Sequence, residues 1–134
     1  MYKIRVAEKN FKPTDYKCKI DNSEEIIKQC YNLSIGITPL IASGIKVAVD
    51  KSIEHKLYLM GACELRLSNI GGVIKKIYSG KAFKNNASLW LRYVDHIEIS
   101  YNSDNPEVEF DGDPAGTLPC SVSLADDELE ILTR

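Results

Sequence analysis

The sequence has few of the residues that usually mark metal or nucleophile chemistry. His55 and His96 are the only two histidines among 134 residues, and neither stands at a metal-ligand spacing or near a Gly-x-Ser-x-Gly nucleophile elbow. The four cysteines form no C-x-x-C pair, and they stand at Cys18, Cys30, Cys63 and Cys120. Because cysteine is one of the most buried residue types, we expect reduced, mostly buried thiols rather than a zinc site or a disulfide framework.

Long apolar runs and blocks of one charge are also absent. The N-terminal residues Met1–Val6 lack the apolar core of a signal peptide, and no run approaches the length that spans a bilayer. The net charge is −2, and no basic run of five or more residues occurs. We therefore predict a cytoplasmic protein with no nucleic-acid partner, and peripheral contact with a membrane stays open.

An alternation of period two dominates the rest of the chain. Such segments, bounded by turn residues, are typical of short strands in a β-sandwich or barrel. The expected strands are 16–21, 25–34, 45–49, 56–63, 89–94, 96–100, 107–110, 120–124 and 129–132. We predict a mainly β fold, a β-sandwich of short antiparallel strands, formed by a single domain over residues 1–134.

One segment has helical spacing instead. Five apolar residues fall at positions i, i+3, i+4, i+7 and i+8, which places them on one helical face: Ile70, Val73, Ile74, Ile77 and Tyr78. Ser68 can cap the start and Gly80 can end the helix. The pattern predicts one amphipathic helix at about 69–79.

The stretch "EVEFDGDPAGTLP", Glu107–Pro119, raises a question about chemistry. An alternating strand stops at Asp111-Gly112-Asp113, and Asp-Gly between alternating segments is a strong hairpin signal. The same carboxylates could also serve a reaction. A phosphate loop elsewhere is not supported, because Ala82 follows Gly80-Lys81 where a P-loop needs Ser or Thr.

The C-terminal text "HIEISYNSDNPEVEFDGDPAGTLPCSVSLADDELEIL" resembles the end of the diacylglycerol kinase and sphingosine kinase superfamily, which includes the bacterial YegS-like lipid kinases. That family has a strand leading into Asp-Gly-Glu, two prolines around Gly or Thr, and two final strands. The positions that match are Ile97–Ile99, Val108–Phe110, Asp111–Asp113, Pro114, Gly116-Thr117, Pro119, Val122 and Leu129–Leu132. Upstream of it, the helix at 67–81 and the stretch "SGIKVAVDKSIEHKLYL" match the family more weakly, in the same order along the chain.

The resemblance implies the second half of a lipid kinase. Family kinases hold ATP on a Gly-Gly-Asp-Gly-Thr loop of an N-terminal domain, and this chain contains no such loop. Their C-terminal half is a β-sandwich that covers the lipid site. By this resemblance Asp113 is the catalytic proton acceptor or a nucleotide contact, while Asp111 and Gly112 shape the turn close to nucleotide or substrate.

The resemblance also bears on cofactors. Bacterial members hold a structural magnesium through acidic residues of a loop that corresponds to Glu54–Lys56. Only Glu54 is acidic here, and His55 and Lys56 do not suit a hard cation. We therefore predict no metal site, and expect ATP and magnesium only in a complete kinase that includes an ATP-binding domain.

Two functions stay open on the sequence. The chain is either the lipid-binding half of such a kinase, inactive without its ATP-binding domain, or a non-catalytic module that binds a lipid or a protein. Diacylglycerol or a sphingoid base is the lipid that the resemblance suggests. Sheet surface left uncovered by a missing domain would favour a homodimer. A third alternative is a small β-rich domain that shares only the architecture.

Overall fold

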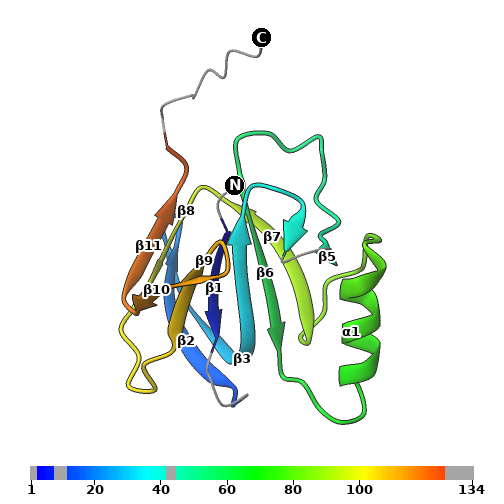
Figure 1. Ribbon diagram of the computed structural model, residues 1–134, viewed down its shortest axis with the longest axis horizontal. Helices are drawn as coiled ribbons and strands as arrows, with labels where there is room; N and C mark the ends of the chain where they lie inside the picture. The colour runs from blue at the N-terminus through cyan, green and yellow to red at the C-terminus, as the bar shows by residue number, and fades with distance from the viewer. Residues whose placement is uncertain (1–2, 8–11, 42–44, 126–134) are drawn as a thin grey trace.

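The computed structural model describes residues 3–7, 12–41 and 45–125, and within them the fold is mainly β with one helix (Figure 1). The strands and the helix follow the chain as β1 Lys3–Ala7, β2 Thr14–Ile20, β3 Ser23–Gly36, β4 Leu40–Ile41, β5 Ile45–Lys46, β6 Leu57–Cys63, α1 Ile70–Ser79, β7 Leu89–Val94, β8 His96–Ile99, β9 Glu107–Phe110, β10 Asp113–Thr117 and β11 Cys120–Ser123.

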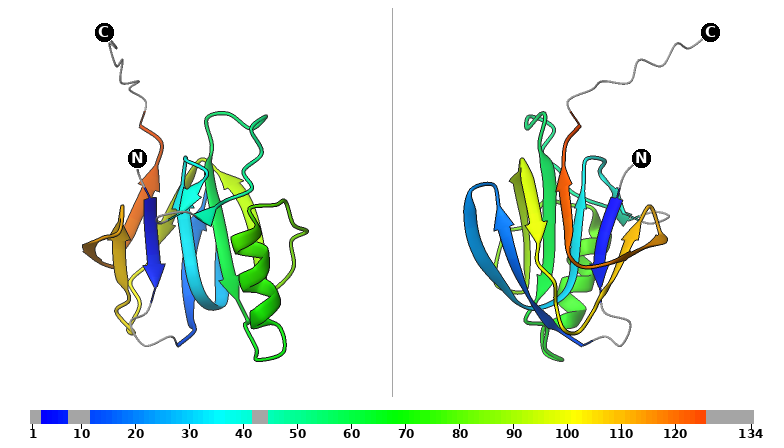
Figure 2. Two further views of the ribbon diagram at one scale, coloured as in Figure 1. Left: turned by 45° about the vertical axis from the view of Figure 1, so that its right-hand side comes forward. Right: turned by 90° about the vertical axis from the view of Figure 1, so that its left-hand side faces the viewer.

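Nine strands form one continuous antiparallel sheet, and β4 and β5 form a separate pair. The order β10-β9-β1-β3-β2-β8-β11 runs across the sheet, and β6 and β7 branch from β3. The second half of β3 pairs with β1 on one side and β6 on the other, whereas its first half pairs with β2. The sheet therefore divides at β3 into two layers (Figure 2).

The division occurs where β3 bends. Gln29 takes a left-handed conformation with φ 46°, and the register shifts on both neighbours there, opposite Thr14 and opposite Cys63. The Gln29 N–H donates to Asp15 Oδ1 at 2.8 Å, which holds the bulge. Bulges bend a strand and increase its twist, so β3 leaves the layer of β2, β8 and β11 and enters the layer of β1, β6 and β7.

The main core lies between the layers. Side chains that alternate along β2, β3, β6 and β8 are buried there: Tyr16, Cys18, Ile27, Leu33, Ile35, Leu57, Leu59, Ile97 and Ile99. Fully burying an aliphatic side chain of this size stabilises a fold by roughly 1.5–3 kcal/mol. Burial of these alternating side chains between the two layers is thus what holds the layers together.

A smaller core lies on the other face of β6, under α1. Tyr58 and Met60 point to this side and pack with Val73 of α1 and Leu89 of β7. Every residue of β6 is buried, because one face meets the main core and the other meets this second core. At Gly61 the Trp90 ring packs so closely that a Cβ would lie 2.3 Å from it, so only glycine fits there without displacement.

The helix begins one residue later than predicted and ends as expected. Asn69, not Ser68, occupies the N-cap position, and Gly80 ends the helix in a left-handed conformation with φ 63°. Its apolar face is only half covered: Val73 is buried, whereas Ile70, Ile74 and Tyr78 stay exposed. The described chain contains no helix long and apolar enough to cross a bilayer.

Most predicted strands are present. The strand expected at 45–49 is only two residues long, as β5, and the strands β1, β4 and β10 were not predicted. Cys18, Cys30 and Cys63 are buried free thiols, and Cys120 is half-buried, as predicted. The strand expected at Leu129–Leu132 lies outside the described residues.

Candidate functional site

The Asp111-Gly112 pair forms the two-residue turn between β9 and β10. Asp113 pairs with Phe110 across the hairpin, so only Asp111 and Gly112 lie between the strands. Both have positive φ, 52° and 91°, as the central residues of a type I′ turn do. Asp111 and Asp113 are both exposed.

The hairpin continues as an irregular edge strand. In β10 the register against β9 shifts between Pro114 and Gly116, and Gly116 has φ 134°. All five residues of β10 are exposed, and Pro114 lacks an N–H to donate. A strand of this kind positions Asp113 by its backbone pairing, because no side-chain packing surrounds it.

The register places this turn at the same end of the layer as the Glu54–Lys56 loop. Phe110 lies opposite Ile4, Gly36 lies opposite Lys3, and Tyr58 lies opposite Gly36. Strands are spaced about 4.8 Å apart, so β9 and β6, separated by β1 and β3, lie roughly 14 Å apart. The Asp111–Asp113 turn and the Glu54–Lys56 loop thus lie at the same end of this layer, with β1 and β3 between them.

The loop before β6 is shaped by its own hydrogen bonds. Asp50 Oδ1 accepts hydrogen bonds from the Ser52 hydroxyl at 2.7 Å and from the Ser52 N–H at 2.9 Å. Both bonds lower the pKa of Asp50, and the bond from the hydroxyl has the larger effect. Lys56 Nζ lies 2.6 Å from Asp95 Oδ1. Glu54 is the one carboxylate of Glu54–Lys56, and the Lys56 ammonium pairs with Asp95, so these side chains do not fit a structural magnesium. No group of three or more metal-ligand side chains gathers within the described ranges.

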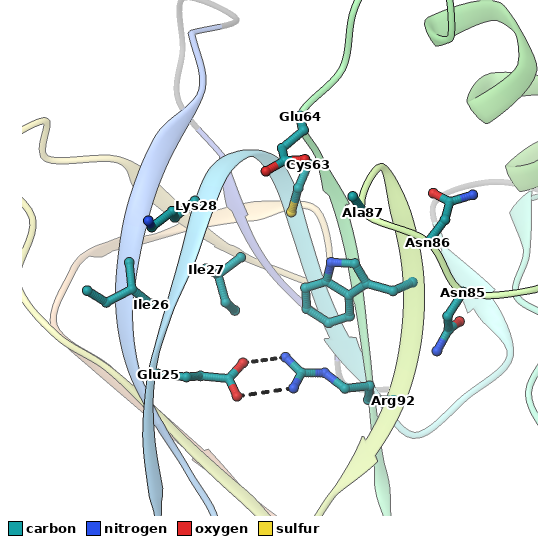
Figure 3. Close-up of a pocket in the computed structure, with 11 residues that line it drawn as sticks. Glu25, Ile26, Ile27, Lys28, Cys63, Glu64, Asn85, Asn86, Ala87 and Arg92 are labelled. Carbon is teal, nitrogen blue, oxygen red and sulfur yellow. Dashed lines mark hydrogen bonds and ion pairs between the residues drawn. The ribbon is translucent and has the colours of Figure 1, made fainter.

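A cavity of about 520 Å³ lies elsewhere, between the first half of β3 and the edge strand β7 (Figure 3). Eleven residues line it: Glu25, Ile26, Ile27, Lys28, Cys63, Glu64, Asn85, Asn86, Ala87, Trp90 and Arg92. Both strands are edges of their layers, so the cavity is the mouth between the layers on this side. We call these eleven residues the β3–β7 mouth.

A charged pair spans the mouth. The Arg92 guanidinium donates two hydrogen bonds to the Glu25 carboxylate, at 2.5 and 3.2 Å, as Figure 3 shows. The same guanidinium lies over the Trp90 ring, 4.4 Å from its centroid. Glu25 and Arg92 are about one-third exposed, so water screens part of this attraction.

Cys63 lies at the inner wall of the mouth, opposite Cys30 in the strand register. A hydrogen bond from the Cys30 thiol, followed by one from Trp90 and the nearby charge of Arg92, lowers the pKa of Cys63. The hydrogen bond with Cys63 raises the pKa of Cys30, and burial raises it further. Cys63 is therefore the thiol of the pair that loses its proton more easily.

Two amides of the mouth, those of Asn85 and Asn86, cover the free edge of β7. Asn85 donates to the Leu91 carbonyl at 2.9 Å and accepts from the Leu91 N–H at 3.0 Å, in place of a neighbouring strand. Asn86 Oδ1 accepts from the N–H groups of Ser88 and Leu89. These bonds satisfy backbone groups that an edge strand otherwise exposes.

No motif in the sequence pointed to the mouth. Glu25 and Arg92 are 67 positions apart and meet only through the fold. Trp90 falls in the expected strand 89–94, and its alternation with Arg92 looks like that of any strand. The predicted residues Asp111, Gly112 and Asp113 come together in the turn and do not border this cavity.

Comparison with known proteins gives similarity of structure alone. No family model matches the sequence, and neither does any curated protein. The fold is similar to that of a candidate diacylglycerol kinase from Bacillus anthracis str. Sterne, with a TM-score of 0.63 and 18% identity, over 86% of this chain and 38% of that one. A diacylglycerol kinase from the same strain is similar with a TM-score of 0.59 and 16% identity, over 90% of this chain and 44% of that one.

A third structure, another candidate diacylglycerol kinase from this strain, gives a TM-score of 0.59 and 18% identity, over 84% of this chain and 37% of that one. The predicted resemblance is thus confirmed at the level of the fold: the architecture is that of a part of these diacylglycerol kinase structures. The chain spans less than half the length of each of these structures.

Proposed function

We propose that this domain is the C-terminal, lipid-binding half of a diacylglycerol kinase-like enzyme and works with an ATP-binding domain. The observation that carries the proposal is that the fold matches about two-fifths of such kinases and ends β9 in an Asp-Gly-Asp hairpin turn. ATP and magnesium belong to the other domain in this proposal. The lipid is diacylglycerol or a sphingoid base.

The chemistry assigned to this chain is the acceptance of a proton. The lipid hydroxyl oxygen attacks the γ-phosphorus, the bond from that phosphorus to the β,γ-bridging oxygen breaks, and ADP leaves. The proton of the hydroxyl passes to the Asp113 carboxylate. Exposure of Asp113 at the rim of the domain supports this role, because the group can then reach a substrate held between two domains.

The test is reconstitution. The purified chain alone is expected to transfer no labelled phosphate from ATP to diacylglycerol in mixed micelles, and addition of an ATP-binding domain with a Gly-Gly-Asp-Gly-Thr loop is expected to restore transfer. Asp113→Asn should lower the restored rate about 10²- to 10⁴-fold, the usual contribution of a positioned base.

Asp95→Asn is the matched control, because it makes the same exchange on an exposed side chain in the turn between β7 and β8. The control should keep the restored rate. Equal rates for Asp113→Asn and the unchanged chain would remove Asp113 from the mechanism, and no transfer with any added ATP-binding domain would count against the kinase.

A second candidate function is a non-catalytic binding module. The β3–β7 mouth favours it, because this cavity is built from one chain and needs no second domain. Its walls combine Ile27, Cys63 and Trp90 with the charged pair of Glu25 and Arg92, which suits an apolar ligand with one polar group. Isothermal titration with a short-chain diacylglycerol tests it; Trp90→Ala should abolish binding, and Asp113→Asn should not change it.

A further inference from the structure

The helix α1 leaves part of its apolar face uncovered. Val73 and Ile77 hold it to the second core, and the residues beside them project outward. Ile70, Ile74 and Tyr78 follow one another at intervals of four, so they form one line along the helix. With Leu67, three positions before the helix, they make up the α1 stripe, whose exposed fractions are Leu67 100%, Ile70 38%, Ile74 48% and Tyr78 68%.

The same segment carries charge of one sign. Residues 65–94 include six of the seventeen Lys and Arg residues and none of the nineteen Asp and Glu residues. The segment therefore bears +6, while the remainder, with eleven cations and nineteen acids, bears −8. Five of the six cations are exposed on or next to α1: Arg66, Lys75, Lys76, Lys81 and Lys84.

Apolar side chains in line, with cations around them, are the features of a helix that lies in the interface of an anionic membrane. The apolar groups enter the boundary of headgroups and acyl chains, while each Lys or Arg is attracted by the negative surface. A protein partner is a poorer match, since a stable protein interface engages about 20–30 residues a side. The α1 stripe has four, and a bilayer adds the attraction of every cation nearby.

We propose that α1 docks this domain on an anionic membrane surface through the α1 stripe and the five cations. Gly71 and Gly72 have nothing within 4 Å of a Cβ position, so no other described part of the chain packs against the helix at these two residues. The proposal rests on neither the Asp113 chemistry nor the presence of an ATP-binding domain. A lipid-modifying enzyme that docks in this way would meet its substrate within the membrane plane.

Co-sedimentation of the purified chain with vesicles tests the proposal. The chain should bind vesicles of phosphatidylcholine with phosphatidylserine, bind pure phosphatidylcholine vesicles much less, and lose binding as salt rises. Tyr78→Ser should weaken binding about tenfold, because the ring no longer enters the interface. Tyr101→Ser is its control, since Tyr101 has the same exposed fraction of 68% and lies outside the segment.

Charge is tested in the same assay. Lys75→Gln should weaken binding to the anionic vesicles about fivefold, the effect of one cation near such a surface, whereas Lys17→Gln on β2 should leave it unchanged. All four variants replace exposed residues, and an unchanged melting temperature confirms that each is folded.

Several results would overturn the proposal. One is equal binding to neutral and anionic vesicles, and another is equal loss in Tyr78→Ser and Tyr101→Ser. A third is a concentration-dependent dimer that Tyr78→Ser disperses while vesicles do not bind, which would assign the α1 stripe to a second copy of the chain. Because no nucleotide takes part, a kinase that fails to assemble leaves this assay unaffected.

Discussion

The β3–β7 mouth and the β9–β10 hairpin are both edges of the fold, and they are built in opposite ways. At the mouth, side chains from distant parts of the chain hold one another: Arg92 lies between Glu25 and the Trp90 ring, and Cys63 lies against Cys30. At the hairpin, backbone conformation defines the structure, because the turn has two positive φ values and β10 is exposed throughout. Geometry at the mouth therefore depends on packing, and geometry at the hairpin on the turn residues.

The largest expected difference concerns the reactivity of thiols. Burial above all raises the pKa of Cys18 to about 12, whereas the pKa of Cys63 at the mouth is lowered from its ordinary 9. A lower pKa leaves more thiolate at a given pH, so the thiolate population of Cys63 should exceed that of Cys18 in the folded protein. Timed alkylation with iodoacetamide, read by peptide mass spectrometry, should modify Cys63 long before Cys18.

The unfolded chain is the control for this experiment, because all four thiols should react alike in denaturant. If Cys18 is modified as fast as Cys63 in the folded protein, the mouth does not activate its thiol.

Steric substitution at Gly61, which lies against Trp90 of the mouth, should have the largest effect on stability. Gly61→Ala places a Cβ 2.3 Å from the Trp90 ring, so ring and guanidinium must shift, at a cost of about 1–3 kcal/mol. Gly72→Ala in α1 meets nothing within 4 Å and should stabilise the fold by up to about 1 kcal/mol. Urea unfolding measures both, and a neutral Gly61→Ala would show that Trp90 is free to move.

At the hairpin the corresponding change is conformational. Gly112→Ala forces a side chain into φ 91°, which should cost about 1 kcal/mol although nothing lies within 4 Å of its Cβ. Gly112→Asn should cost less, because asparagine tolerates positive φ better. Thermal unfolding compares the two, and equal losses would mean that volume rather than backbone conformation limits the turn.

The smallest expected difference is between the coupling free energies of two ion pairs, Glu25–Arg92 and Lys56–Asp95. A double-mutant cycle on Glu25→Gln and Arg92→Met should give a coupling free energy of about 0.5–1 kcal/mol, because the pair is bidentate and stacked on Trp90. The same cycle on Lys56→Met and Asp95→Asn should give about 0–0.5 kcal/mol for a single contact of more exposed groups. Equal couplings would mean that stacking on Trp90 adds nothing.

Sequence patterns predicted the local parts of this fold well. Alternation located β2, β6, β7, β8 and β9 to within two residues, and Gly80 ended α1 where expected. The turn at Asp111-Gly112 was also predictable, because a two-residue hairpin needs residues that accept positive φ. These features depend on neighbours along the chain, which the sequence displays directly.

Long-range features could not be predicted in the same way. The strand β10 has the sequence Asp-Pro-Ala-Gly-Thr, without alternation, and forms only because β9 offers an edge to pair with. The bend at Gln29 could not be predicted, because no glycine marks the position where β3 takes a positive φ. The β3–β7 mouth follows from that bend, because the bend carries Glu25 and Arg92 into opposite layers.

The first described strand has a consequence for the order of folding. β9 pairs only with β10 and β1 among the described residues, so the hairpin that carries Asp113 joins the rest of the sheet through β1 alone. That attachment pairs Arg5 with Glu109, more than a hundred positions along the chain, and closing so long a loop is slow. The candidate proton acceptor Asp113 should therefore reach its place among the last events of folding, after the layers have closed.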